Sequence, residues 1–476
     1  MIAAIARKEL TEFSRDGRVL ALLGLMVILV LAALLTGWAT QAERQRQTEY
    51  SQRHDQETFI KQGRKPTHSA AHFGRMAYKP VPALATFDPG AAPYQGQVIW
   101  LEAHRRNPAM FRPAEDAPEL RRLADLSVAG ILTLLLPLLI FLLGHGALVG
   151  ERERGTLGHI LASGPTRYHL FVGKLCAIAA VATGISVITI ATSTALALPG
   201  DFDGSAGDTI ARGASLIAVY VAYGIMLCAV AVAVSARTRS SSSALLILLS
   251  IWALSTVVVP RVAANVADRV HPIADSAAFW KQTIDAMRSA KPRRDSDEYR
   301  AIERAVLSRA FGRDIRADEI ATLQVNRRGL NLEVAELLGA KTYQAAYDDL
   351  HATYGKQRQV RRWFAVFAPA IALQHLSSAL AGTNIDAHEH FSQAAEQQRR
   401  LIISMMNDDL LIRGAHSGDA HLSSHELWER IPNFAYRAPG LPFAIQTATW
   451  DALALLLWSV AALWLARHGV EHQRIF

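Results

Sequence analysis

The sequence predicts an all-α polytopic membrane protein, with six transmembrane helices and a large, mostly helical extracytoplasmic domain built from two segments. Apolar runs of about twenty residues, long enough to span a bilayer, recur along the chain. Two long polar segments, 39–124 and 260–445, interrupt them. Hydrophobic residues make up 51% of the 476 residues and the mean hydropathy is positive, which is unusual for a soluble protein with long charged segments.

The chain begins with a predicted amphipathic helix, 1–18, that lies in the cytoplasmic interface of the membrane. Its apolar residues recur at helical spacing on one face, opposite Arg7, Lys8 and Glu9. The apolar run 19–38 then forms the first span. Its length favours a span over a signal-peptide core of roughly ten residues, although the small residues after it leave a cleavable signal as the alternative.

The remaining elements follow in chain order, each bounded by a change between apolar and polar composition. They are an extracytoplasmic segment 39–124, span two 125–149, a polar cytoplasmic hinge 150–170, span three 171–198, a short external loop 199–213, span four 214–235, a cytoplasmic turn 236–242, span five 243–259, the main extracytoplasmic domain 260–445, span six 446–466 and a cytoplasmic tail 467–476.

The charges of the short loops set the orientation, because long loops are translocated largely regardless of charge. Basic residues gather in 1–18, in 150–170 and in 236–242, which six spans place on one side. Both termini and the hinge are therefore predicted to be cytoplasmic, in a multi-pass protein of the bacterial inner membrane. The short loop on the opposite side is acidic and contains Asp201, Asp203 and Asp208.

One further apolar segment, 364–382, could raise the number of transmembrane spans from six to seven. It is long enough for a seventh span and follows Arg361 and Arg362. However, it contains Pro369 and His375, and a seventh span would place the C-terminus outside. A buried or membrane-grazing helix of the external domain is the preferred interpretation.

The chain lacks the motifs of an enzyme. No G-x-x-x-x-G-K-[ST] occurs, since Gly173-Lys174 lacks the earlier glycine and the hydroxyl residue, so the chain is not expected to bind or hydrolyse ATP by itself. No Gly-x-Ser-x-Gly occurs either. Ionisable residues are nearly absent from the middles of the spans, which argues against ion-coupled transport, and His145 is expected to be a packing residue. Basic residues do not cluster with aromatics, so no nucleic-acid partner is expected.

Polar residues inside the spans allow two interpretations. Hydroxyl residues of span three recur at helical spacing, and such residues commonly hold transmembrane helices together. The alternative is the lining of a substrate path, and two tyrosines of span four are equally ambiguous. These residues are Thr183, Ser186, Thr189, Ser193, Tyr220 and Tyr223.

The seventeen histidines do not predict a metal site. Histidine and carboxylate side chains bind zinc or copper, but no H-E-x-x-H, no Cys–His pair and no Met-rich cluster occurs. The two cysteines, Cys176 and Cys228, fall within spans, so no disulfide framework is expected outside. The weak metal candidates are His388, His390, His421 and His425.

The hinge carries a distinctive pattern, ERERGTLGHILASGPTRYHLFVGK from Glu151 to Lys174. It closely resembles the cytoplasmic coupling-helix region of type-2 ATP-binding-cassette (ABC) exporter permeases. The resemblance implies that a separate ATPase contacts this segment and drives the spans. It implies polar docking contacts at Glu151, Glu153 and Arg154, an apolar face of Leu157, Ile160 and Leu161, helix ends shaped by Gly155, Gly164 and Pro165, and further coupling residues Thr156 and Arg167.

The large segment between spans five and six indicates a particular subfamily within these permeases. Ala368-Pro369, Ala379 to Thr383, His390-Phe391, Arg399-Arg400 and Pro432 to Tyr436 look like one subfamily. That subfamily is loosely grouped with permeases near multicopper-enzyme maturation systems, such as the nitrous-oxide-reductase accessory permease.

The resemblance also implies an assembly and an activity. Two permease chains, as a homodimer or heterodimer in the lipid bilayer, would work with two ATPase chains that bind ATP and Mg, and would export an unknown substrate. One alternative is a mechanotransmitting subunit that rearranges a periplasmic partner and transports nothing through itself. A second alternative is a membrane-anchored scaffold without an ATPase.

Overall fold

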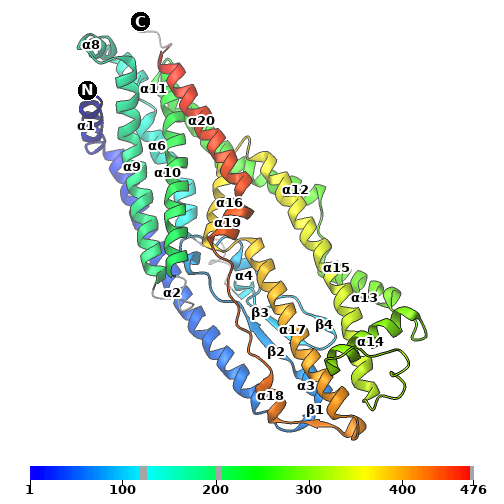
Figure 1. The fold of residues 1–476 in the computed structure, drawn as a ribbon. Coiled ribbons are helices and arrows are strands. Elements are labelled where there is room, and N and C mark those ends of the chain that lie inside the picture. Colours follow the sequence, from blue (N-terminus) through cyan, green and yellow to red (C-terminus); the bar gives the residue numbers. More distant parts are fainter. Residues whose placement is uncertain (117–125, 199–205, 472–476) are drawn as a thin grey trace.

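The computed structural model describes residues 1–116, 126–198 and 206–471. The molecule is elongated, with a helical bundle at one end and a second, mixed domain at the other (Figure 1). Helix α1 and the end of α20 lie at the tip of the bundle that points away from the second domain (Figure 1). Of the acidic loop, Asp201 and Asp203 lie outside the described residues, whereas Asp208 belongs to helix α10.

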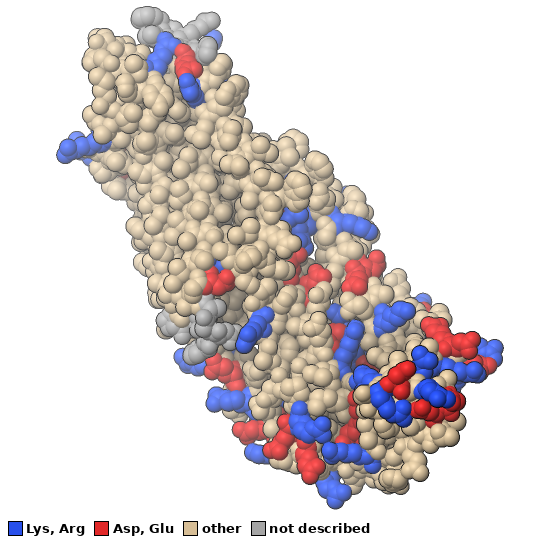
Figure 2. All heavy atoms as spheres, in the orientation of Figure 1, with Lys and Arg blue, Asp and Glu red and all other residues tan. Residues whose placement is uncertain are grey.

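Within the described residues, six helices are long and apolar enough to cross a membrane, which confirms the predicted fold class. Lys, Arg, Asp and Glu are sparse over the middle of the bundle and dense over the other domain (Figure 2). The six are α2 (Gly17–Ile60), α6 (Val128–Gly144) continued by α7 (Val149–Glu153), α9 (Arg167–Ala197), α10 (Ala206–Arg237), the run of α11 (Ser241–Trp252), η4 (Ala253–Val258) and α12 (Val259–Val270), and α20 (Thr449–Glu471).

Helices α6 and α10 form the centre of the bundle. The side chains of Leu132, Leu139 and Phe141 on α6 are fully buried. Gly144 allows α10 to approach closely, because a Cβ at this position would lie 2.5 Å from the Cβ of Ala231. Small residues at such crossings are typical of membrane bundles, where close packing replaces the hydrophobic effect between helices.

Helix α2 does not end where its apolar run ends. The chain from 39 to 60 contains no proline or glycine and is rich in Gln, Glu, Arg and Ala, so the helix continues beyond the bilayer. Its 44 residues correspond to about 66 Å, roughly twice the thickness of the hydrocarbon core. One continuous helix therefore connects the bundle with the second domain (Figure 1).

The second domain combines both long polar segments. Strand β1 (Lys65–Pro66) pairs antiparallel with β5 (Leu422–Ser423), which joins the two segments directly. A three-stranded antiparallel sheet, β2 (Arg75–Tyr78), β3 (Val98–Glu102) and β4 (Arg105–Arg106), adds strands to a mostly helical domain. The other elements are η1 (Ala83–Thr86), η2 (Ala92–Tyr94), η5 (Gly418–Ala420), α3 (Thr67–Phe73), α4 (Pro113–Asp116), α13 (Ser276–Ala290), α14 (Asp297–Phe311), α15 (Arg327–Phe364), α17 (Ile385–Arg413), α18 (His425–Arg430) and α19 (Leu441–Thr447).

The apolar segment 364–382 forms the end of α15 and the short helix α16 (Pro369–Ala381). Thirteen residues correspond to about 20 Å, which is too short to cross a bilayer, and α16 is not among the six candidate spans. Most of its side chains are buried against α10 and α20. Trp363 and Phe367, just before α16, are exposed, as aromatic residues at a membrane–water interface commonly are.

Candidate functional site

The hinge consists of two short helices, α7 and α8 (Thr156–Ala162), at the tip of the bundle (Figure 1). Gly155 separates them with a φ of +69°, a left-handed conformation that costs other residues about 1–2 kcal/mol. A Cβ at Gly155 would meet no atom within 4 Å, so the backbone conformation alone requires glycine here. The predicted single coupling segment is therefore bent at Gly155.

The second end of the hinge is fixed by a capping box. Gly164, with a φ of +110°, and Pro165 end the turn after α8. Thr166 caps α9: its hydroxyl accepts a hydrogen bond from the backbone N–H of His169, and the His169 ring accepts one from the backbone N–H of Thr166. The direction in which α9 leaves the hinge is set locally, by side chains adjacent in sequence.

A buried cluster of charges lies beneath the hinge. The carboxylate of Glu151 accepts from the ammonium of Lys8 at 2.9 Å and from that of Lys174 at 3.3 Å. Arg154 lies 3.4 Å from the same carboxylate, and the hydroxyl of Thr156 also donates to it. The side chain of Glu151 is 3% exposed. Its carboxylate is thus occupied by contacts within the chain.

The cluster connects the N-terminal helix α1 (Ile2–Phe13) to α9. The ammonium of Lys174 donates to Oε1 of Glu9 at 2.6 Å. Burial by itself would lower the pKa of Lys8, but the hydrogen bonds to Glu151 and Glu12 have the larger combined effect, so the pKa is raised. Lys8 therefore stays cationic and holds α1 against α7.

Close packing reinforces this attachment of α1. A Cβ at Gly173 of α9 would lie 2.7 Å from the Cβ of Ile5, so only glycine admits α1 at this distance. The adjacent residue Lys174 supplies the ion pair. The predicted hinge, the N-terminal helix and the start of α9 thus form one packed unit.

The other predicted coupling residues divide between interior and surface. Leu157 is buried, and Ile160 and Leu161 are half-buried against the bundle core. Glu153 is exposed but accepts hydrogen bonds from the backbone N–H and the hydroxyl of Ser241, at the start of α11. The half-buried Arg167 donates to the backbone oxygen of Glu471, and Pro165 is also half-buried. Up to the end of the turn after α8, the exposed residues of the hinge are Glu153, Arg154, Gly155, His159, Ala162, Ser163 and Gly164.

The hydroxyl residues of α9 do not line the cavity that Tyr220 of α10 reaches. The hydroxyl groups of Ser186 and Ser193 are buried and donate to carbonyl oxygens of their own helix, at Ala182 and Thr189. Such bonds satisfy the hydroxyls within a packed helix. On α9, Thr183 is half-buried and Thr189 is buried, and neither they nor the two serines line the cavity described next. Tyr223, on α10, is also buried.

A cavity of about 660 Å³ lies where the bundle meets the second domain. The hydroxyl of Tyr220 reaches it and lies 3.1 Å from that of Ser377 on α16. Arg362 on α15 is paired with Asp451 on α20 at 3.0 Å. Residues of α6, α10, η4, α15, α16 and α20 line the cavity, so spans and second domain share it.

Three arginines of α15 face this cavity, and two of them have carboxylate partners. Arg358 is paired with Asp386 at 2.7 Å, and Arg362 with Asp451. The Nε atom of Arg361 is buried and has no hydrogen-bond partner within the described structure. Burial lowers the pKa of Arg361, although Asp451 opposes this. The cavity therefore presents an incompletely satisfied guanidinium group.

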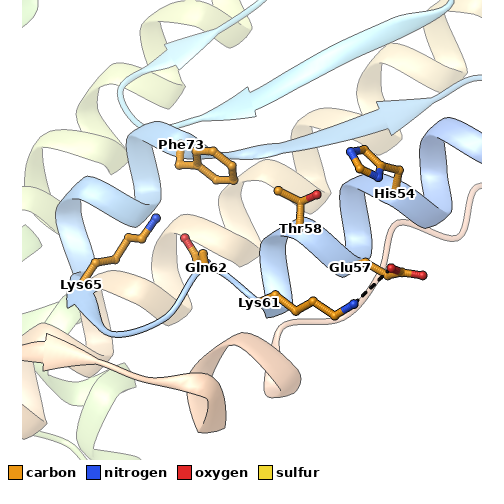
Figure 3. Close-up of a pocket in the computed structure, with 7 residues that line it drawn as sticks. All are labelled: His54, Glu57, Thr58, Lys61, Gln62, Lys65 and Phe73. Carbon is orange, nitrogen blue, oxygen red and sulfur yellow. Dashed lines mark hydrogen bonds and ion pairs between the residues drawn. The ribbon is translucent and has the colours of Figure 1, made fainter.

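A second, shallower groove lies at the far end of α2. It is lined by His54, Glu57, Thr58, Lys61, Gln62, Lys65 and Phe73 (Figure 3). Lys61 is paired with Glu57 at 3.3 Å, and the ammonium of Lys65 lies 4.9 Å from the centre of the Phe73 ring. Since the groove is open and its charged side chains are mostly exposed and locally paired, it is not the candidate site.

The four weak metal candidates have separate partners. His388 contacts the ammonium of Lys79 at 3.4 Å, and His390 contacts the hydroxyl of Tyr436 at 3.0 Å. Over the described ranges, none of the four belongs to a cluster of potential ligands. His421 and His425 lie near carboxylates, Asp409 and Glu429 respectively.

A different group of histidines was missed by the sequence analysis. The ring nitrogens of His68, His72 and His104 lie within 4.8 Å of one another. The spacing of His68 and His72, four apart on α3, was the available signal. Burial lowers the pKa of His68 to about 4. His104 comes from the β3–β4 turn, and only the fold brings it to α3.

Comparison with known proteins agrees with the mostly helical architecture and its six candidate spans. A family model described as ABC-2 family transporter protein matches residues 3–466, nearly the whole chain. No curated protein matches the chain. This family lacks an ATPase motif of its own, and its membership implies ATPase partner subunits. The chain belongs to the ABC-2 family and is the membrane-spanning permease subunit of an ABC transporter.

Proposed function

We propose that this permease works with two copies of a separate ATPase, which bind ATP and Mg, and that ATP hydrolysis drives export across the bacterial cytoplasmic membrane. The observation that carries the proposal is the hinge, α7 and α8, which has an exposed face and is attached to α1 through the buried carboxylate of Glu151. This carboxylate pairs with Lys8 of α1 and with Lys174, which pairs in turn with Glu9 of α1. A displacement of the hinge by the bound ATPase would therefore move α1, α6 and α9 together. The termini and the hinge would be cytoplasmic.

The exposed residues of α8 define the docking surface. His159 and Ala162 face solvent, whereas Leu157 is buried. We assign the ATPase contact to this exposed face and to Arg154, and assign Glu151 to the internal cluster that supports it.

A second permease chain is part of the proposal, as a homodimer or a heterodimer. The fifth span is the least buried of the six in a single chain. Leu246, Ile247, Leu254 and Val258 on it are exposed. Such a surface requires either lipid or another permease chain.

The substrate route is proposed to include the cavity around Arg361. The cavity connects the outer ends of the spans with the second domain, and its lining includes the charged groups of Arg358, Arg361 and Arg362, of which Arg361 has a buried Nε atom without a hydrogen-bond partner in the described structure. The resemblance to permeases near multicopper-enzyme maturation systems supports a finer grouping of the chain, but it does not identify what enters this cavity.

A second candidate function, mechanotransmission to a periplasmic partner, is favoured by α2. This single helix leads from Gly17 in the bundle to Ile60 in the second domain without a break. A rigid connection of this kind would transmit a displacement of the spans directly. The scaffold alternative has no such support, because family membership implies ATPase partners.

The first experiment tests docking. The chain is co-expressed and co-purified with a candidate ABC ATPase subunit, and ATPase activity is measured for wild type and His159→Glu. A negative charge on the exposed face should reduce association at least tenfold. His54→Glu, on the exposed part of α2, is the matched control and should associate normally. Equal association of both variants would contradict the assigned surface.

The second experiment separates the two candidate functions. Gln47→Pro breaks α2 at an exposed position between bundle and second domain, and Gln47→Ala is its control. Spin labels on the two domains report ATP-dependent distance changes in the assembled transporter. Mechanotransmission predicts that the proline abolishes the change in the second domain while ATPase activity persists. A preserved distance change would remove α2 as the transmitting element.

A further inference from the structure

We infer that His68, His72 and His104 form a binding site for one divalent zinc ion in the second domain, remote from the coupling hinge. The Nε2 atoms of His68 and His72 are 3.2 Å apart. Two nitrogens bound to one tetrahedral zinc at 2.0–2.1 Å would be about 3.3 Å apart. The first two ligands therefore already have the separation that the ion requires.

The third histidine approaches from a different element. The ring of His104 lies 5.2 Å from that of His68 and 5.4 Å from that of His72, between centroids. All three sets of ligand nitrogens lie within 4.8 Å, so side-chain rotations can bring them to one ion. Three imidazoles with an open fourth position are a ligand set that zinc accepts.

The backbone positions His104 in an uncommon conformation. Its φ is +63°, in the left-handed region that few residues other than glycine adopt. Its backbone N–H donates to Oε2 of Glu336 at 3.0 Å, and its Nδ1 lies 3.7 Å from the same oxygen. A carboxylate near the non-ligating nitrogen is the arrangement that orients histidine ligands of metals.

Glu336 is itself fixed by the domain core. Arg399, 1% exposed, contacts Glu336 at 2.6 Å and Glu396 at 2.8 Å. The same guanidinium donates to the backbone oxygen of Glu102, on the strand that leads to His104. The third ligand is thus supported from two directions, whereas His72 is exposed and leaves an entry path for the ion.

Binding would tie α3 to the β3–β4 turn. These elements belong to the first polar segment, and α3 also packs on α17 of the second. The proposal needs neither the ATPase nor the transported substrate, because all its ligands lie in this one domain.

The test uses the full-length chain in detergent, purified with a tag that contains no histidine and treated with a chelator. Zinc alone is titrated against a chromophoric competitor, and cobalt is used as a spectroscopic probe. Wild type should bind one zinc per chain, with the visible absorption of four-coordinate cobalt. His72→Asn should weaken zinc binding at least tenfold, and zinc should raise the melting temperature of wild type but not that of His72→Asn.

His425→Asn is the control, because His425 is an exposed histidine of the same domain that lies outside the cluster. It should bind zinc as wild type does. A second variant, His104→Asn, tests the ligand that only the fold supplies, and should also weaken binding. Zinc binding that is absent from wild type, or unchanged in both His72→Asn and His104→Asn, would overturn the site.

Discussion

The ammonium of Lys174, on α9, lies 2.6 Å from Oε1 of Glu9, on the N-terminal helix α1, and both side chains are almost completely buried. The same ammonium lies 3.3 Å from Glu151 in the hinge. Three segments distant in sequence are therefore joined at one nitrogen atom. Buried charges of this kind are costly to separate, since removal of one partner leaves the other desolvated and unpaired.

Lys174→Met should lower the free energy of unfolding by about 3 kcal/mol, because it leaves Glu9 without its nearest buried cation. Denaturant titration in detergent measures this change. In the assembled transporter, the permease variant should also no longer stimulate the activity of the ATPase subunits, because the hinge is no longer held to α1 and α9. The double variant with Glu9→Gln should regain part of the stability.

Lys61→Met is the matched control for this prediction. Lys61 is paired with Glu57, but both side chains are exposed, and exposed pairs contribute about 1 kcal/mol or less. A loss of stability as large as that of Lys174→Met would show that the buried position of Lys174 is not the reason for the effect.

Gly155→Ala should destabilise the hinge by about 1 kcal/mol, because alanine must adopt the φ of +69° that separates α7 from α8. Gly158→Ala, in α8 itself and with no atom within 4 Å of the added Cβ, should be neutral or stabilising. The measurement is the permease-stimulated ATPase activity of the two variants, which should fall in Gly155→Ala and be unchanged in Gly158→Ala. A similar effect of both substitutions would mean that the bend is not needed.

Gly173→Ala should displace α1, because its Cβ would lie 2.7 Å from the Cβ of Ile5. Gly184→Ala, on the same helix with no atom within 4 Å of the new Cβ, is the control. Hydrogen exchange of the α1 amides should be faster in Gly173→Ala only. Unchanged protection would show that α1 tolerates a larger separation from α9.

The second domain should lose stability in acid partly through His388. Burial, together with the neighbouring charges of Lys79, His351 and Arg112, lowers the pKa of His388 to about 3. The Lys79 ammonium can only donate, so the His388 nitrogen 3.4 Å away must be unprotonated. Because the unfolded chain binds the proton near pH 6.5, the stabilisation is complete above that pH and is lost progressively as the pH falls toward 3.

His388→Gln should therefore show a smaller loss of melting temperature between pH 6.5 and pH 4 than wild type. His425→Gln, at an exposed position, should behave as wild type. If His388→Gln retains the full acid sensitivity, protonation of another group is responsible.

The amino-acid pattern determined the membrane part of this protein. Apolar runs of span length must form helices in a bilayer, because every backbone polar group there needs an internal partner. The proline and polar residues of 364–382, together with the orientation of the C-terminus, favoured a non-spanning helix there, and the segment contains the 13-residue helix α16. Helix ends outside the bilayer were less predictable, since α2 continues to Ile60 through a polar sequence and packs there on the second domain, with Phe59 in its core.

Only the tertiary structure decided which charges meet. Glu151 is part of an exposed-looking polar run in the sequence, yet it is 3% exposed because Lys8 and Lys174 approach from two other helices. His104 likewise joins His68 and His72 only through the β3–β4 turn. Local periodicity specifies helices and their apolar faces, but contacts between distant polar side chains depend on how those helices pack, which no short window of sequence contains.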